Sequence, residues 1–147
     1  MHIVLHQPEI PQNTGNIGRT CVALGATLWL VRPLGFRLDH ARLKRAGLDY
    51  WDALDVRDVA DWDDLKQRLG TENPGHWWYF TKRGELLYDE IEYGGDDVLV
   101  FGSETQGLPS GLLAGQATVQ IPILPPVRSL NLSNAVAIAA YQARPRS

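Results

Sequence analysis

The chain has 147 residues, of which 44% are hydrophobic and 21% charged, a composition typical of a globular protein. Its formal net charge of −3 does not indicate a nucleic-acid-binding protein, and no apolar run reaches the roughly 20 residues that span a bilayer. The single cysteine, Cys21, excludes an intrachain disulfide, and the N-terminus lacks the basic start of a signal peptide. We therefore expect a cytoplasmic protein without a membrane anchor, folded as a single domain over residues 1–147.

The first half of the chain alternates short apolar runs with helical patterns. In chain order, these patterns predict a strand at residues 3–5, a helix at 13–24, a strand at 27–31, a short basic helix at 39–46, a strand at 53–56 and a helix at 61–69. A glycine follows each predicted helix, as is common at helix C-termini.

The second half continues the same alternation. It predicts a strand at residues 77–81, a strand at 98–101, a short helix at 109–113, a strand at 118–121 and a final helix at 130–143. Strands that alternate with helices predict an α/β fold with a mostly parallel sheet flanked by helices. In such sheets ligands bind beyond the carboxyl ends of the strands, where three polar or Gly-rich loops begin here at His6, Gly102 and Pro122.

The first loop leads into a helix and is rich in small polar residues. Asn13 or Thr14 can cap that helix, and Gly15 and Gly18 allow the close approach of another group. Arg19 follows Gly15 by about one helical turn and shares its face, so it can clamp an anion or a ribose. A capped helix with small residues for packing is the alternative.

The second loop follows the apolar strand at residues 98–101. Gly102 at the strand end leaves room for a flat ligand beside the backbone. Glu104 is the only acid in this loop. We expect its carboxylate to contact a hydroxyl or amine of a ligand. A turn with a solvated acid is the alternative.

The third loop is stiffened by prolines and delivers polar side chains to the start of an Ala-rich helix. Because a helix start exposes unpaired N–H groups, this cluster predicts a site for a polar ligand; its members are Ser129, Asn131, Ser133 and Asn134. The helix then presents small apolar residues that suit tight packing, within the core or across a dimer, at Val136, Ala137, Ala140 and Tyr141.

Two further groups of residues bear on partners. The four histidines are dispersed and there is no second cysteine, so we expect no metal site. Basic residues concentrate between positions 32 and 45, and they predict either a basic face or an ordinary solvated surface; they are Arg32, Arg37, Arg42, Lys44 and Arg45.

Taken in order, the three loops resemble the motifs of the SPOUT class of knotted RNA methyltransferases. Residues 13–19 match the first family motif, Asn-x-Gly-x-x-x-Arg; residues 101–109 match the second; and residues 121–122 with 129–135 match the third. The match covers essentially the whole chain. The segments at residues 8–17 and 45–50 resemble one branch, the tRNA (cytidine/uridine-34)-2′-O-methyltransferases.

This resemblance implies a deep trefoil knot in the C-terminal part, S-adenosylmethionine as the cofactor, and a homodimer packed through the first and last helices. It implies methyl transfer to the ribose 2′-OH of the wobble nucleotide, in the anticodon region of tRNA. The basic residues from Arg32 to Arg45 would then contact the tRNA. There are two alternatives. The chain could methylate another RNA such as ribosomal RNA, or it could be a catalytically silent RNA- or nucleotide-binding module on the same fold.

The resemblance also assigns residues by motif position. It places five residues around the cofactor: Phe80, Gly102, Ile121, Ser129 and Leu130. It places five in the catalytic set: Asn13, Arg19, Glu104, Ser129 and Asn131. Of these, Arg19 would face the cofactor held by the partner subunit.

Overall fold

A seven-stranded sheet runs through the molecule in the order β3-β2-β1-β6-β4-β7-β5. The structure is a computed structural model that describes residues 1–41 and 49–146. Its strands pair in parallel along the whole sheet, and they are β1 (His2–His6), β2 (Thr27–Val31), β3 (Val56–Val59), β4 (Trp77–Phe80), β5 (Leu86–Leu87), β6 (Val98–Phe101) and β7 (Thr118–Gln120). The predicted α/β class with a parallel sheet is confirmed.

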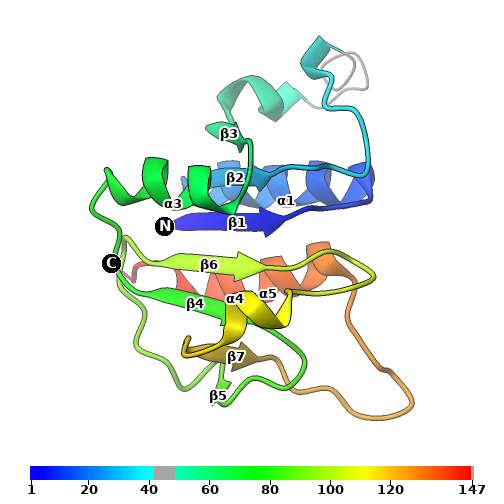
Figure 1. Cartoon of the computed structure of the whole chain (residues 1–147), viewed down its shortest axis with the longest axis vertical. Helices are drawn as coiled ribbons and strands as arrows, with labels where there is room; N and C mark the ends of the chain where they lie inside the picture. The colour runs from blue at the N-terminus through cyan, green and yellow to red at the C-terminus, as the bar shows by residue number, and fades with distance from the viewer. Residues whose placement is uncertain (42–48, 147) are drawn as a thin grey trace.

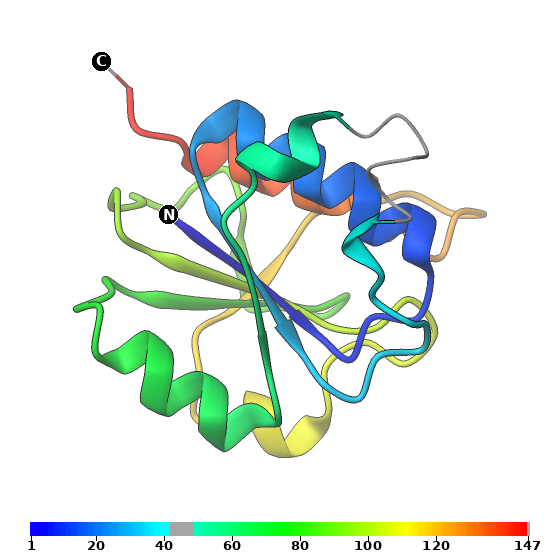
Figure 2. The same cartoon turned by 90° about the horizontal axis from the view of Figure 1, so that it is seen from above.

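Helices cover both faces of this sheet. The described helices are α1 (Pro11–Leu24), α3 (Trp62–Gly70), α4 (Ser110–Leu113) and α5 (Leu132–Ala143), with a 3₁₀ helix, η1, at Asp49–Ala53. Figure 2 shows α1 and α5 together over one face, and α3 and α4 over the other. The strands lie side by side between these layers, with β1 and β6 at the centre (Figure 1). None of the described helices has the length and apolar character needed to cross a membrane.

The core divides into two clusters, one on each face of the sheet. Successive strand residues point to opposite faces, so Ile3 and Leu5 pack toward α1 while Val4 between them packs into the other cluster. Leu65, fully buried on α3, belongs to that other cluster. Cys21 on α1 is only 1% exposed, and burial raises the pKa of its thiol to about 12, so it stays protonated at neutral pH.

Small side chains let α5 pack closely on α1. Val136 and Ala140, two of the four residues predicted for this packing, are completely buried against the first cluster. Tyr141 is 44% exposed and Ile138 is 39% exposed, so the side of α5 that carries them lies outside the core of this chain. The predicted close packing within the core is confirmed for the buried side of the helix.

The start of α1 differs from the prediction. The helix begins at Pro11, two residues before the predicted start, because proline has a φ angle suited to the first helical turn. Its N-cap is Ile10, which has no capping side chain. The expectation that Asn13 or Thr14 caps the helix is therefore wrong; both are buried inside its first turn.

The predicted strand at residues 53–56 is also wrong. The strand β3 occupies Val56–Val59, because the preceding residues form η1 and bury Trp51 and Leu54 against α1. The two-residue strand β5 was not predicted. The predicted helix at 39–46 falls mostly outside the described residues.

The other predicted ends are right to within two residues. The helix predicted at 61–69 spans Trp62–Gly70 because Asp61 is its N-cap and accepts a hydrogen bond from the backbone N–H of Asp64. Likewise the final helix starts at Leu132 because Asn131 caps it.

Candidate active site

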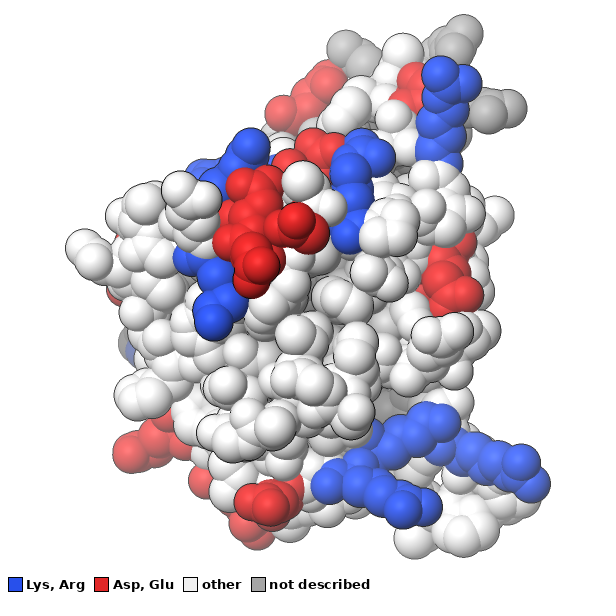
Figure 3. Space-filling view, in the orientation of Figure 1, with Lys and Arg blue, Asp and Glu red and all other residues white. Residues whose placement is uncertain are grey.

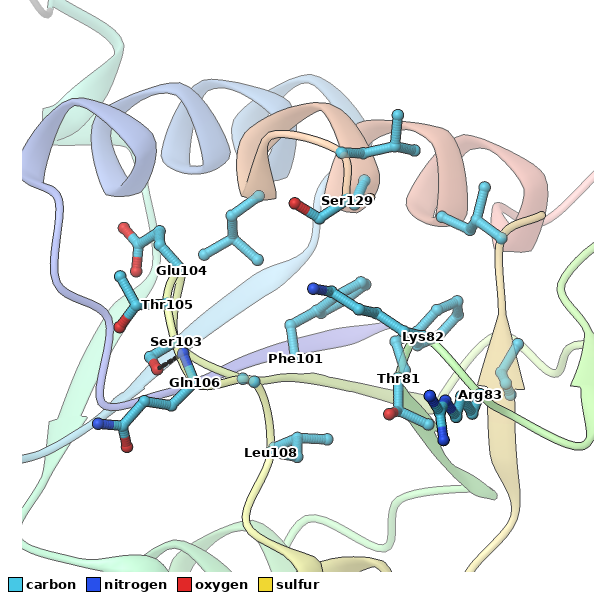
Figure 4. Close-up of a pocket in the computed structure, with 18 of the residues that line it drawn as sticks. Thr81, Lys82, Arg83, Phe101, Ser103, Glu104, Thr105, Gln106, Leu108 and Ser129 are labelled. Carbon is cyan, nitrogen blue, oxygen red and sulfur yellow. Dashed lines mark hydrogen bonds between the residues drawn. The ribbon is translucent and has the colours of Figure 1, made fainter. Parts of the chain in front are cut away.

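A pocket of about 380 Å³ opens at the carboxyl ends of β4, β6 and β7. Loops that follow these strands form its walls, together with the start of α5 (Figure 4). The volume lies in the range of small-molecule and cofactor sites, and the position is the one that parallel α/β sheets use for ligands. The pocket includes the second and third loops singled out in the sequence.

Two aromatic rings form an apolar part of the pocket wall. Phe80 ends β4 and Phe101 ends the neighbouring β6, and their rings stack with centroids 4.6 Å apart. Both are nearly buried and both line the pocket, as do Ile121 and Leu130. Such a surface can hold the apolar parts of a ligand while the loop backbones supply hydrogen-bonding groups. All five residues predicted for the cofactor line this pocket: Phe80, Gly102, Ile121, Ser129 and Leu130.

Gly102 has a packing role beside its place in the pocket wall. A Cβ atom at this position would lie 2.0 Å from the carbonyl carbon of Gly107 and 2.2 Å from the backbone nitrogen of Leu108. The space on the Cβ side of Gly102 is therefore filled by the protein's own backbone, while the residue still lines the pocket, so the expectation that it leaves room for a flat ligand stays a prediction. The glycine also lets the loop fold back on itself, closed by the hydrogen bond from Gly107 N–H to the carbonyl of Ser103.

Glu104 joins the second loop to the first. Its carboxylate accepts hydrogen bonds from the backbone N–H groups of Glu9 (2.8 Å) and Ile10 (2.7 Å), and from Nδ2 of Asn13 (3.2 Å). It therefore sits at the N-terminus of α1, where the helix dipole favours a negative charge. The alternative of a turn with a solvated acid is wrong, because the carboxylate is held by three donors.

Glu9 strengthens the same connection and was missed in the sequence. Its carboxylate accepts hydrogen bonds from the backbone N–H (3.0 Å) and the hydroxyl (2.6 Å) of Thr105. These bonds lower the pKa of Glu9. Each loop thus contributes one carboxylate to the other. An acid between Pro8 and Pro11 was the available signal, but its partner lies 96 residues away.

Asn131 extends this network to the third loop. Its Nδ2 donates to Oδ1 of Asn13 at 3.1 Å, and its Oδ1 accepts from the backbone N–H groups of Ser133 and Asn134. The chain of contacts from Glu104 through Asn13 to Asn131 brings together three of the predicted catalytic residues. Ser129, a fourth, lines the pocket with Glu104.

Arg19 is not brought to the other predicted catalytic residues within this chain. It is exposed on α1, its guanidinium lies 5.8 Å from the ring centroid of Tyr50, and it does not line the pocket. Tyr50 in turn donates a hydrogen bond to the carbonyl of Gly15 at 2.8 Å. At Gly18, a Cβ would lie only 2.9 Å from the Trp51 ring, so this glycine serves the packing of α1 on η1.

A polar turn after β4 also lines the pocket and was missed in the sequence. It contributes Thr81, Lys82 and Arg83 (Figure 4). Three polar residues between an apolar strand and a glycine were the available signal, but the sequence does not show that β4 lies next to β6 and β7 in the sheet.

The predicted basic face is only partly described. Arg42, Lys44 and Arg45 lie outside the described residues. Arg32 pairs with Asp58, with 2.5 Å between nitrogen and oxygen, so its charge is balanced locally. Across residues 1–41 and 49–146, no three side chains of the metal-binding kinds gather into a group. The expectation of no metal site stays a prediction.

Comparisons with known proteins agree on one family. The model of the family described as SpoU rRNA Methylase matches residues 1–141. A protein of Saccharophagus degradans named tRNA (cytidine(34)-2′-O)-methyltransferase is 45% identical over 146 residues, which cover 97% of this chain and 92% of that protein.

Two solved structures show the same fold. One, described as giving insight into the 2-OH methylation of C/U34 on tRNA, is 48% identical, with a TM-score of 0.88 over 97% of this chain and 92% of that one. The other, an AdoMet-bound rRNA methyltransferase from Sinorhizobium meliloti, is 28% identical, with a TM-score of 0.82 over 97% of this chain and 54% of that one.

Proposed function

Because the chain belongs to the SpoU rRNA Methylase family, we propose that it transfers a methyl group from S-adenosylmethionine to a ribose 2′-OH of tRNA. The target would be the wobble nucleotide, a cytidine or modified uridine at position 34, as in the names of the relatives that match nearly the full chain. The observation that carries the proposal is the hydrogen-bonded chain from Glu104 through Asn13 to Asn131 beside the pocket. It joins one residue from each of the three motifs.

The residues present fit the proposed cofactor. Phe80, Ile121 and Leu130 offer apolar surface, while Gly102 and Ser129 lie where loop backbones approach the pocket, so these five would hold it. When bound, S-adenosylmethionine supplies an electrophilic methyl group on a sulfonium. A pocket with apolar walls shields that group from water. The AdoMet-bound structure with the same fold supports this choice of cofactor.

The polar network would position the ribose rather than react with it. Glu104 and Asn131 hold Asn13 from two sides, so its side chain is fixed at the N-terminus of α1. Positioning of this kind can supply several kcal/mol of the reaction barrier. The 2′-OH must lose its proton during attack. Arg19 would act as a phosphate or ribose clamp that lowers the pKa of that hydroxyl, because a guanidinium resists deprotonation and is therefore a poor base.

We further propose that the active unit is a homodimer packed through α1 and α5. Arg19 is exposed on α1 and absent from its own pocket, and Ile138 and Tyr141 leave apolar surface on α5. In such a dimer Arg19 would face the cofactor of the partner subunit. Residues 1–147 would act as one domain, with the C-terminal part knotted as in the SPOUT class, and a tRNA substrate would place the enzyme in the cytoplasm.

Methyl transfer to total tRNA tests the reaction. The purified chain is incubated with labelled S-adenosylmethionine and either total tRNA or ribosomal RNA, and the modified nucleoside is mapped. We expect label in tRNA, as a 2′-O-methylated nucleotide at position 34. Label in ribosomal RNA alone would favour the alternative substrate, and cofactor binding without transfer to either RNA would favour the silent binding module.

Mixed dimers test the placement of Arg19. Arg19→Ala should abolish methylation with cofactor affinity nearly intact, whereas Arg68→Ala, at an exposed arginine on α3, should leave both unchanged. Coexpression of Arg19→Ala with Glu104→Gln should restore about a quarter of wild-type activity, since half of randomly assembled dimers are mixed and each has one complete site. No recovery in isolated mixed dimers would place Arg19 in the site of its own chain.

A further inference from the structure

The turn after β4 presents two cations at the pocket. Thr81 N–H donates to the carbonyl of Val119 at 2.9 Å, and Gly84 N–H donates to the carbonyl of Thr81 at 3.3 Å, so residues 81–84 form a β-turn anchored on β7. Lys82 and Arg83 are its two central residues, and both are exposed. A Cβ at Gly84 would lie 2.3 Å from the carbonyl carbon of Val119, so the turn packs directly against the backbone of β7.

No ion pair among the described residues balances the charges of this turn. Within the described parts of the chain, neither Lys82 nor Arg83 forms an ion pair, whereas Arg32, Arg57 and Arg68 all do. Figure 3 shows Lys and Arg side chains gathered over the loops that follow β4 and β7. The cations of those two loops are Lys82, Arg83 and Arg128, the last directly before the pocket residue Ser129.

Figure 4 shows how the two turn side chains meet the pocket. Lys82 points into the hollow between Phe101 and Ser129, while Arg83 lies at its side next to Thr81. Both side chains are long and end in water, so they can reach an anion that enters through the mouth of the pocket.

The charge of the proposed cofactor indicates whether these cations bind the cofactor or the RNA. S-adenosylmethionine carries a sulfonium and an ammonium against one carboxylate, so its net charge is positive and a cluster of cations repels it. An RNA strand brings phosphates, each negative, next to the ribose that must enter the pocket. Unbalanced cations at the mouth of the pocket therefore suit the substrate rather than the cofactor.

We propose that Lys82 and Arg83, with Arg128 beside them, form a phosphate-binding rim that holds the RNA backbone next to the target ribose. This rests on the proposed function and deepens it, since it names the part of the RNA that the site binds. The contact is with the backbone and carries no base preference, so it fixes the strand's position while other contacts choose the nucleotide.

The salt dependence of tRNA binding tests this rim. The double variant Lys82→Ala with Arg83→Ala should flatten the plot of log Kd against log salt concentration, by about 0.7 for each lost phosphate contact on a single strand. The exchange variant Lys82→Arg with Arg83→Lys should keep the wild-type slope. The control, Lys66→Ala with Arg68→Ala on α3, removes the same charge away from the pocket and should also keep it. Thermal denaturation checks that each variant is folded.

Cofactor affinity, measured by titration calorimetry, separates the remaining outcomes. Unchanged affinity together with a flattened slope supports the rim. If the double variant bound the cofactor about tenfold more weakly but kept the wild-type salt slope for tRNA, the turn would be assigned to the cofactor and the rim would be overturned. The rim would also be overturned if the α3 control changed the salt slope as much as the double variant does. If the wild-type chain binds tRNA through this rim yet transfers no methyl group to it, the proposed reaction fails while the rim stands.

Discussion

The strand β6 carries a carboxylate close to each of its ends, and the two are used differently. Asp97, just before the strand, accepts hydrogen bonds from the backbone N–H groups of His76 and Gly94 and from Nε1 of Trp78. Glu104, just after it, accepts from two backbone N–H groups and from the side chain of Asn13. Each is therefore matched by three donors, but only Glu104 lines the pocket.

The surroundings of the two carboxylates explain their separate roles. Asp97 is 1% exposed, and a Cβ at Gly75 would lie only 2.3 Å from its Oδ1, so no ligand can reach it. Glu104 is partly exposed at the edge where strands of a parallel sheet point toward ligands. Asp97, before β6, thus stabilises the fold, whereas Glu104, after β6, holds the loops around the site in place.

Removing the acceptor at Asp97 should give the largest effect on stability. In Asp97→Asn, an NH₂ group replaces one oxygen and meets N–H donors in a buried site. We expect a loss of about 3 kcal/mol in the free energy of unfolding, measured in urea. The neighbouring exposed Asp96→Asn is the control and should change little. If Asp97→Asn kept its stability but lost cofactor affinity, the division between the two ends of β6 would be wrong.

The matching change at the other end should affect the reaction more than the fold. Glu104→Gln keeps the shape but replaces one carboxylate oxygen with an NH₂ group. The N–H groups of Glu9 and Ile10 and the side chain of Asn13 then share one acceptor oxygen in place of two, so Asn13 is held less firmly. We expect methyl transfer to fall about 100-fold, with a loss in unfolding free energy of about 1 kcal/mol. Glu92→Gln, an exposed acid elsewhere, should match wild type in both. A stability loss as large as that of Asp97→Asn would make Glu104 a second structural carboxylate.

The reciprocal contact from Glu9 should contribute less. Thr105→Val removes the 2.6 Å hydroxyl hydrogen bond to Glu9 but keeps the backbone N–H donor. We expect kcat to fall about tenfold with KM for the cofactor unchanged, because one of several ties between the loops is lost. Thr105→Ser restores the hydroxyl and should recover most of the activity. Equal losses in both variants would show that the hydroxyl has no positioning role.

The sequence predicted the fold wherever local pattern and burial agree. The strands at residues 27–31 and 98–101 have the predicted bounds, because each is a nearly unbroken apolar run buried on both faces of the sheet. The strand before α3 was misplaced because Leu54 looks like strand sequence but belongs to the turn after η1. The two-residue β5 is too short for any pattern.

The site was predicted less completely, because its contacts are long-range. The structure brings Ser129 and Glu104, both assigned by motif position, to one pocket, whereas Asn131, predicted as part of a polar-ligand site, caps the last helix. The partners of Glu104 lie 91 to 95 residues away in the chain, and the turn with Lys82 reaches the pocket only through the strand order. No local spacing encodes such pairs.

The smallest predicted effect is a pH dependence that belongs to the Asp97 end of the sheet. His2 begins β1 there, and its Nδ1 accepts a hydrogen bond from Nε1 of Trp29 at 3.2 Å, so this nitrogen must be unprotonated. Burial lowers the pKa of His2 below its ordinary value of 6.5, and the nearby N-terminal ammonium adds to this. Below about pH 6.5, His2 therefore binds a proton more readily in the unfolded chain than in the folded chain.

The stability contributed by His2 should therefore be fully present above about pH 6.5 and should decrease as the pH falls through 6.5 toward the lowered pKa. We expect a loss below about 1 kcal/mol, because His2 keeps some contact with water. In His2→Asn, an amide oxygen can accept from Trp29 without titrating, so the free energy of unfolding between pH 7.5 and 5.5 should vary less than in wild type. His6 supplies a remaining slope, since burial lowers its pKa too. If His2→Asn instead shifted the pH profile of cofactor binding, the two ends of the sheet would be coupled rather than separate.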